Sequence, residues 1–462
     1  MPEKNIRKHQ LANAPSELGT EDIGRLLFRF SVPAIVGLLC NAMQNIINRI
    51  FVGNAVGSEA LGAVAIVFPI WIIFIAISGL IGIGGSTLTA MRLGQGRNDE
   101  AEELLGQSIV LLFLIPAVLY AVGIWYIEPI LVFFGATETI LPYAKDYLSI
   151  ILLAMVFACP SIGVNNFIRT EGSPKVSMYT QILVAAITIV LNYIFVIMMG
   201  WGVKGAALGV VIANFVSLFW IFGYFTSKKS FLKIRVRYFR IKLSLTRKIM
   251  TLGMASFLLN ITNSIQQLIL NRTVAFQGGD TALAVISIIT GLSSLLILPM
   301  IGFNQAAQPI IGYNYGARNP LRIKDTLWKG MAWATVYAII SFVVVQIWAE
   351  PLVTIFDSGD AEVVSMAVHA IRIFFICLPL ISLQMMSSGY FQAIGKPLIA
   401  SVISLSRQVL VFIPILLILP NFMGIEGVWL AAPISDAVSF VVAVVLIREA
   451  TRHLNGLIAE QY

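Results

Sequence analysis

The chain has 462 residues, of which 58% are hydrophobic and only 12% are charged, and its mean hydropathy is +0.88. A soluble domain carries roughly a quarter charged residues, so this composition excludes an ordinary soluble protein and makes a lipid bilayer the expected solvent. The net charge of +8 does not indicate nucleic-acid binding, because the basic residues are spread over short connections and form no single basic face.

Long apolar runs follow one another along the whole chain. Each is long enough to cross a bilayer as a helix, which takes roughly 20 residues, and none shows the alternation over about ten residues that marks a barrel strand. We place the spans at 26–52, 60–85, 107–125, 140–168, 177–199, 205–226, 249–271, 281–302, 330–348, 363–391, 398–420 and 424–447. The predicted fold is an all-α polytopic membrane protein with twelve transmembrane helices arranged as two pseudo-symmetric six-helix bundles.

The two halves of the chain repeat each other at an offset of about 222 residues. Short matches keep this register: Arg97-Asn98 recurs as Arg318-Asn319, Gly172-Ser173-Pro174 as Gly395-Lys396-Pro397, and Gly202-Val203-Lys204-Gly205 as Gly424-Ile425-Glu426-Gly427. Because each half holds an even number of spans, both halves share one orientation. The predicted organisation is a cytoplasmic tail (1–25), an amino-terminal lobe (26–226), a basic linker (227–248), a carboxy-terminal lobe (249–447) and a second cytoplasmic tail (448–462).

The distribution of Lys and Arg predicts the orientation in the membrane. The connections on one side, including both tails and the linker, carry 25 of the 31 basic residues, and such an excess marks the cytoplasmic side. We therefore expect a multi-pass protein of the inner (plasma) membrane with both termini in the cytoplasm. The alternating Lys-Ile-Arg-Val-Arg at 233–237 favours a linker that lies at anionic lipid headgroups over one that binds nucleic acid.

Two stripes of amide side chains lie inside the predicted spans. Residues spaced i, i+3, i+4 and i+7 share one helix face, and an amide in hydrocarbon needs a partner or water. The stripes are Asn41, Gln44, Asn45 and Asn48 in span one, and Asn260, Asn263, Gln267 and Asn271 in span seven. Two interpretations stay open, namely hydrogen bonds between helices and the lining of a wet substrate cavity.

Two full charges are predicted at mid-membrane depth. Arg407 lies about 15 Å along its helix from Pro397, and Asp436 lies about 18 Å back from Arg448, at 1.5 Å per residue. Since charges inside membranes usually pair, we expect an ion pair, which is either a permanent structural brace or a switch that responds to protonation or ligand.

The sequence shows no pattern typical of a metal or cofactor site. Its cysteines (Cys40, Cys159 and Cys377) and histidines (His9, His369 and His453) have no ligand spacing, so we expect no metal and no cofactor. A membrane-embedded enzyme would need a nucleophile, an acid/base pair or a metal cluster at membrane depth, and none is apparent. The protein is not expected to be an enzyme.

Several short motifs resemble those of the multidrug and toxic compound extrusion family. They are Asn48 to Gly53, Gly94-Gln95-Gly96-Arg97, Arg169-Thr170-Glu171-Gly172, Gly316-Ala317-Arg318-Asn319, Ser406-Arg407-Gln408 and Pro433-Ile434-Ser435-Asp436, and the resemblance extends from about residue 25 to 450. It implies efflux of amphipathic, often cationic compounds by antiport with protons or sodium, through rocking of two six-helix lobes. The sequence departs from the family where its branches carry acids, because Asn48, Asn192, Asn263 and a neutral position near Ile381 align with those acids. Asp436 is therefore the candidate coupling residue.

The leading hypothesis is a monomeric secondary antiporter for small molecules, embedded in membrane lipids and without a nucleic-acid partner. A flippase of lipid-linked precursors is the alternative, although it would be favoured by a strongly cationic cavity and the predicted interior carries mainly amides. A channel would be expected to carry a ring of repeated filter residues, and a two-fold repeat disfavours such a ring.

Overall fold

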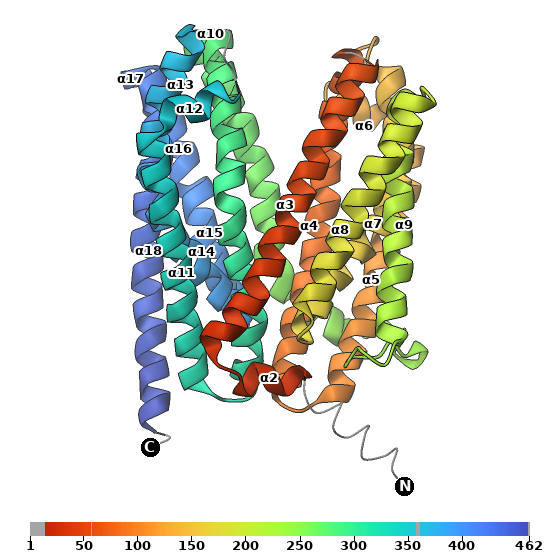
Figure 1. The fold of residues 1–462 in the computed structure, drawn as a ribbon, viewed down its shortest axis with the longest axis vertical. Helices are drawn as coiled ribbons and strands as arrows, with labels where there is room; N and C mark the ends of the chain where they lie inside the picture. The colour runs from red at the N-terminus through yellow and green to blue at the C-terminus, as the bar shows by residue number, and fades with distance from the viewer. Residues whose placement is uncertain (1–13, 57, 357–360, 461–462) are drawn as a thin grey trace. The chain divides into compact units, whose positions relative to one another are not determined.

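A computed structural model describes residues 14–56, 58–356 and 361–460 of the chain, almost all of them in helices (Figure 1). The first half contains α2 (Ala14–Thr20), α3 (Ile23–Val56), α4 (Ser58–Gly94), α5 (Asn98–Trp125), α6 (Ile127–Phe133), α7 (Leu141–Thr170), α8 (Pro174–Asn192), η1 (Tyr193–Met198) and α9 (Gly202–Thr226). After η2 (Val236–Tyr238), the second half contains α10 (Leu243–Gly316), α11 (Pro320–Ile347), α12 (Ala349–Thr354), α13 (Ala361–Phe374), α14 (Leu378–Ala393), α15 (Pro397–Leu405), η3 (Ser406–Val411), α16 (Phe412–Ile418), α17 (Pro420–Met423) and α18 (Ile425–Ala459).

The described helices account for twelve crossings. Ten segments are long and apolar enough to span a bilayer, and one further span is formed by α13 and α14, which are bent by 50° at a short break. The 74-residue α10 counts as two crossings because Gly279 interrupts it with a φ of 59° and a ψ of −149°. Glycine adopts this left-handed region at little cost, whereas a side chain there would be strained. The predicted all-α fold with twelve spans is confirmed.

The chain divides into two compact units. The first unit comprises Met1–Glu21 and Val32–Asn260, and the second comprises Asp22–Ser31 and Ile261–Tyr462. The predicted lobes meet at the linker, whereas these units exchange two helical segments. The start of α3 packs with the second unit, and the start of α10 packs with the first.

The sequence repeat is visible in the backbone. Gly202 and Gly424 lie at equivalent helix starts and have φ values of 57° and 59°, and Gly172 and Gly395 both adopt positive φ just before a helix that begins with proline. The match between Arg97-Asn98 and Arg318-Asn319 was shifted by one residue. Arg318, with a φ of 56°, occupies the turn position that Gly96 holds in the first half. This region is costly for a residue with Cβ, and the backbone conformation agrees with the offset of about 222 residues, which places Arg318 opposite Gly96.

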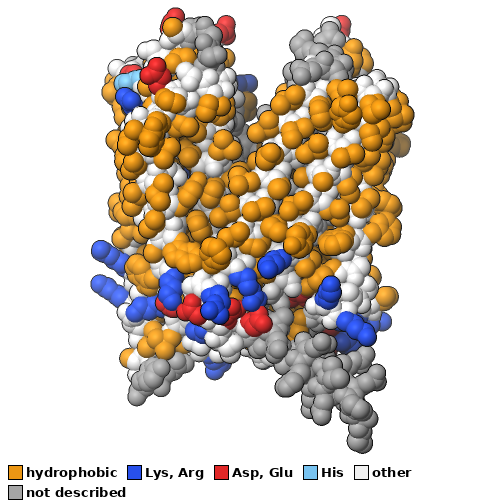
Figure 2. Space-filling model, in the orientation of Figure 1, with side chains coloured by type: hydrophobic (Ala, Val, Ile, Leu, Met, Phe, Trp, Pro, Cys, Tyr) orange, Lys and Arg blue, Asp and Glu red, His pale blue; other side chains and the backbone are white. Residues whose placement is uncertain are grey.

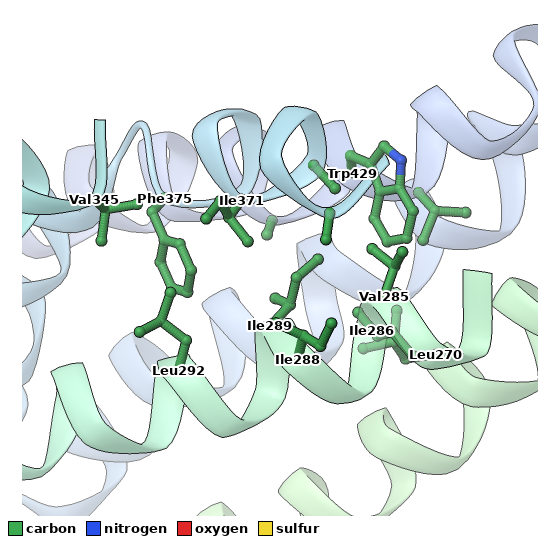
Figure 3. Packing of buried hydrophobic residues seen from close by; sticks show 14 of the residues in the cluster. Leu270, Val285, Ile286, Ile288, Ile289, Leu292, Val345, Ile371, Phe375 and Trp429 are labelled. Atoms are coloured by element: carbon green, nitrogen blue, oxygen red, sulfur yellow. The ribbon is translucent and has the colours of Figure 1, made fainter. Parts of the chain in front are cut away.

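The core of the second unit explains why its helices pack as they do. In the second part of α10, Ala282, Val285, Ile289 and Leu292 recur every three or four residues and are buried, so they share one helix face. Figure 3 shows this face packed beneath Phe375, Ile371 and the fully buried Trp429. The first unit has a corresponding cluster, which includes Phe74, Leu131, Leu148 and Met155.

The chain ends differ from the predicted tails. The segment predicted as a carboxy-terminal tail from 448 continues α18 to Ala459, because it is rich in helix formers and buries Leu454. Of the predicted tail 1–25, residues 1–13 lie outside the described part, and α3 already begins at Ile23. Likewise α10 begins at Leu243, so the stretch between spans is 227–242 rather than 227–248.

The beginning of α3 and the end of α18 lie at the same end of the second unit. Both contact the start of α11, where Lys329 Nζ is 3.9 Å from Asp22 Oδ2 and Lys324 Nζ donates to Asn455 Oδ1 at 2.8 Å. Figure 2 shows hydrophobic side chains along the helices on one face and Lys and Arg gathered toward their lower ends. We call this end of each unit, where the Lys- and Arg-rich connections lie, its basic end.

Candidate functional site

Amide side chains join the first and fifth spans of the first unit. Asn41 Nδ2 on α3 donates to Gln181 Oε1 on α8 at 2.9 Å, and Asn192 Nδ2 at the end of α8 donates to Asn48 Oδ1 at 2.7 Å. Asn41 and Asn48 lie two helical turns apart and thus on the same face of α3. Two of the four amides in the first stripe therefore serve helix packing.

The second unit contains an equivalent contact. Gln408 Nε2 in η3 donates to Asn263 Oδ1 on α10 at 2.5 Å, which again joins the first and fifth spans of a half. Sequence analysis missed Gln181 and Gln408 as partners of the stripes. Gln181 follows Thr180 and Gln408 follows Arg407, so the available signal was a polar pair inside an otherwise apolar run.

The fifth span of each half departs from α-helical geometry beside its amide. η1 begins directly after Asn192, and η3 contains both Arg407 and Gln408, so the Asn48 to Asn192 contact lies beside a π-helical segment and the Asn263 to Gln408 contact lies within one. In a π-helical turn the bonded backbone groups belong to residues five rather than four positions apart, and such segments are frequent at functional sites. Within η3, Arg407 and Gln408 contact partners on two different helices, α18 and α10.

Arg407 and Asp436 are paired inside the second unit. Arg407 Nε lies 2.6 Å from Asp436 Oδ1, and Ser435 Oγ donates to the Arg407 carbonyl oxygen. The Asp436 side chain is 5% exposed and that of Arg407 is 24% exposed. A carboxylate this far from water needs such a partner to remain charged, so a change at either residue alters the state of the other.

The other stripe residues do not bridge to another span through the contacts described. Asn45 is exposed on α3, while Gln44 is half-buried. Asn260 Nδ2 donates to the Ser256 carbonyl oxygen one turn before it, and Gln267 Nε2 donates to Asn271 Oδ1 one turn after it at 3.1 Å. The stripes thus combine amides that join helices with amides that are exposed or bonded within their own helix.

A further polar cluster lies between α10 and α14. Gln308 Nε2 donates to Asn304 Oδ1 at 3.2 Å and to Gln392 Oε1 at 3.3 Å, and Asn304 Nδ2 donates to the Met385 carbonyl oxygen at 3.0 Å. A Cβ at Gly389 would stand 1.8 Å from Asn304 Oδ1, so this approach requires glycine. The two predicted stripes do not include this cluster, although Asn304 and Gln308 have the i, i+4 spacing of a shared face.

Glu171 fastens the linker to the basic end of the first unit. The fully buried carboxylate follows α7 and accepts hydrogen bonds at Oε2 from Ser230 Oγ at 2.9 Å, Phe231 N at 3.1 Å and Leu232 N at 2.9 Å. Burial raises the pKa of Glu171 to about 7, although these donors and Tyr224 favour the charged form. Its charge therefore changes near neutral pH.

Metal binding finds no support in the part of the chain that the structure describes. No three His, Cys, Asp or Glu side chains there lie close enough together to hold an ion. The polar groups described within the spans are amides and hydroxyls that form hydrogen bonds, together with the Arg407 and Asp436 ion pair.

Comparison with known proteins gives a consistent result along the chain. The MatE family model matches residues 33–194 and 255–418. The chain is 25% identical to the "Multidrug export protein MepA" of Staphylococcus haemolyticus over 94% of this chain and 95% of that protein. It is also 25% identical to a protein of Shewanella oneidensis named "FAD transporter", over 93% and 94% of the two chains.

Solved structures share the fold. A MOP superfamily transporter from Pyrococcus furiosus superposes with a TM-score of 0.89 at 23% identity, covering 96% of this chain and 99% of that one. An outward-facing MATE family transporter of the MOP superfamily gives a TM-score of 0.91 with the same coverage and identity.

Proposed function

Because the chain belongs to the MatE, or multidrug and toxic compound extrusion, family of efflux transporters, we propose that it exports small amphipathic cations in exchange for protons or sodium. It is a transporter and not an enzyme, and transporters of this family use no cofactor. We propose that it acts as a monomer by alternating access. We further propose that it lies in the plasma membrane with both termini in the cytoplasm, since the basic end of the second unit holds the start of α3 and the end of α18.

The coupling role is proposed for Asp436, with Arg407 as its counter-charge. Of the three acids that are buried in the described part of the chain, Glu102 lies near the start of α5 and Glu171 follows α7, whereas Asp436 lies within a span, about 18 Å from Arg448. A proton, a sodium ion or a cationic substrate that neutralises Asp436 would free Arg407 from its partner. The observation that supports ion coupling at this site is the pairing of Arg407 with an almost fully buried carboxylate.

The amides are proposed to supply the substrate path. Asn45, Gln267 and Asn271 offer neutral donors and acceptors, which bind cations without the desolvation cost of a fixed charge. This composition supports amphipathic cations more than the lipid-linked anions of a flippase. Since one relative is named as an FAD transporter, FAD is the natural anionic comparator in the assay.

The test is transport by purified protein in liposomes, with proton and sodium gradients imposed separately and a fluorescent lipophilic cation as substrate. Asp436→Asn should abolish gradient-driven transport while leaving protein abundance in the membrane unchanged. Removing Asp436 from a structural brace would instead strand Arg407 and lower stability. The double variant Asp436→Leu with Arg407→Met distinguishes the two roles, because full transport by that protein would reject coupling at this pair.

The orientation has its own test. Reporter fusions after Tyr462 and within the connection at 349–362 should report opposite sides of the membrane. Reports from one side only would contradict the proposed topology.

A further inference from the structure

The linker between α9 and α10 is held against the first unit by a row of acids. Arg235 Nε lies 2.5 Å from Glu102 Oε2 and Lys242 pairs with Glu103, both acids of α5. Gln107 Nε2 on the same helix donates to the Lys242 carbonyl oxygen at 2.8 Å. Together with the bonds to Glu171 at its beginning, these contacts hold both ends of the linker in place.

The second half of the linker carries exposed apolar side chains. Val236 is 79% exposed, Ile241 is 51% exposed and Leu243 is 80% exposed, and Phe239 between them is 38% exposed. Four exposed apolar side chains within eight residues form a patch of the kind that marks an interaction site rather than ordinary surface. Exposure of these apolar side chains to water is energetically unfavourable.

Cations flank the apolar patch. Lys228, Lys229 and Arg240 make no ion pair with any acid that the structure describes, whereas Arg235 and Lys242 are neutralised by α5. The acids of α5, including Asp99 beside Arg237, thus neutralise one set of linker cations and leave Lys228, Lys229 and Arg240 unneutralised. The resulting surface combines apolar side chains with unneutralised positive charge.

The position of the linker identifies the partner. It joins the end of one span at Thr226 to the start of another at Leu243, and Figure 1 shows it beside the lower ends of α5 and α9. A segment tied to two spans in this way stays within a few residues of the bilayer surface. Apolar insertion together with basic residues is the two-part signal that holds a segment at an anionic membrane surface.

We propose that residues 228–243 form a docking surface for anionic phospholipids of the adjacent leaflet. In it, Val236, Ile241 and Leu243 insert at the boundary of headgroups and acyl chains, while Lys228, Lys229 and Arg240 contact lipid phosphates. This surface is independent of the proposed transport chemistry. It attaches the basic end of the first unit to anionic lipids, and through the linker it also attaches the start of α10.

The test uses the full-length protein with its three native cysteines replaced, and with single spin labels at Val236→Cys or Leu243→Cys. In nanodiscs of phosphatidylcholine with phosphatidylglycerol, collisions with oxygen should be frequent and collisions with a water-soluble nickel chelate rare. In phosphatidylcholine alone, the preference for oxygen should be several-fold smaller. Gln95→Cys, exposed in the turn between α4 and α5, is the control and should meet the nickel chelate in both membranes.

Charge variants complete the experiment. Removing the unneutralised cations together (Lys228→Gln, Lys229→Gln and Arg240→Gln) should abolish the effect of phosphatidylglycerol on the labels. The matched pair Lys175→Gln with Lys396→Gln removes basic charge elsewhere and should leave that effect intact. Labels that meet the nickel chelate in every membrane would overturn the proposal, and so would labels shielded from both reagents, which would indicate a protein partner. A phosphatidylglycerol effect that persists in the triple variant would equally reject recognition of anionic lipid.

Discussion

Substitution of Gly253 by alanine is expected to destabilise the first unit, because the start of α10 crosses α4 there with backbone against backbone. A Cβ at Gly253 would stand 1.7 Å from the Leu80 carbonyl oxygen, and one at Gly84 would stand 2.1 Å from the Ile249 carbonyl oxygen. Real Cβ atoms essentially never approach closer than 3.0 Å, so the two helices must separate by about 1.3 Å to accept a methyl group at position 253. Neither backbone atom can rotate away as a side chain would.

The magnitude follows from two opposing effects. Overpacking of a tight contact costs about 1–3 kcal/mol, whereas exchanging glycine for alanine in a helix gains about 1 kcal/mol from the unfolded state. Gly223 on α9 is exposed and a Cβ added to it would meet nothing within 4 Å, so Gly223→Ala should show the gain alone. Gly79 is intermediate, because its nearest neighbour is the Ser256 hydroxyl at 2.8 Å, which can rotate. The predicted order of stability is Gly223→Ala, then Gly79→Ala, then Gly253→Ala.

The assay is thermal unfolding of the purified variants in one detergent, followed by tryptophan fluorescence and by recovery of monodisperse protein after heating. Gly253→Ala should fall below the wild type and Gly223→Ala should rise above it. Equal stabilities of Gly253→Ala and Gly223→Ala would refute the argument, since the crossing would then be loose enough to accept a methyl group.

Three further outcomes are expected. Because burial raises the pKa of Glu171 from 4.5 to about 7, the folded protein binds the proton more tightly than the unfolded chain does. The free energy of unfolding should therefore fall by up to about 3 kcal/mol as pH rises through this window. Glu171→Gln should remove that part of the pH dependence of thermal unfolding, and an unchanged profile would contradict this prediction. A double-mutant cycle with Asn48→Ala and Asn192→Ala should give a coupling energy of about 0.6–1.7 kcal/mol in chemical unfolding, and strictly additive effects would show that the two amides do not interact. Cysteines at Asn45 and Gln267 should react with small water-soluble thiol reagents and be protected by substrate, whereas inertness at both would assign them to packing alone.

The positions of the spans and the pairing of Arg407 with Asp436 could be predicted from the sequence for simple physical reasons. Span length is set by bilayer thickness, which a run of apolar residues reports directly. The depth of Arg407 and Asp436 in the membrane follows from counting residues from the end of each helix. Two opposite charges at the same depth in a span have few other partners available, so they are expected to pair. These inferences need only one coordinate, the distance along the membrane normal.

The amide contacts needed more than depth. Whether Asn41 meets Gln181, or Asn263 meets Gln408, depends on how far each helix is rotated about its own axis, and a π-helical segment changes that rotation within one span. A single shifted backbone bond creates such a segment, and no residue type demands it. Neutral amides also tolerate several partners, so their positions alone left packing and cavity lining equally supported.

The exchange of segments between the units shows a different limit. A repeat detected by offset implies only that the two halves have the same local structure, and it predicted matching first spans. It could not show that Asp22–Ser31 packs with the second unit while the start of α10 packs with the first. The glycines that permit the second contact are visible in the sequence as Gly79, Gly82, Gly84 and Gly85, and small residues in a span favour close helix packing without naming the partner helix. The partner is Gly253 on α10. A backbone approach this close requires glycine on both helices, and the sequence of α4 alone shows the glycines of only one of them.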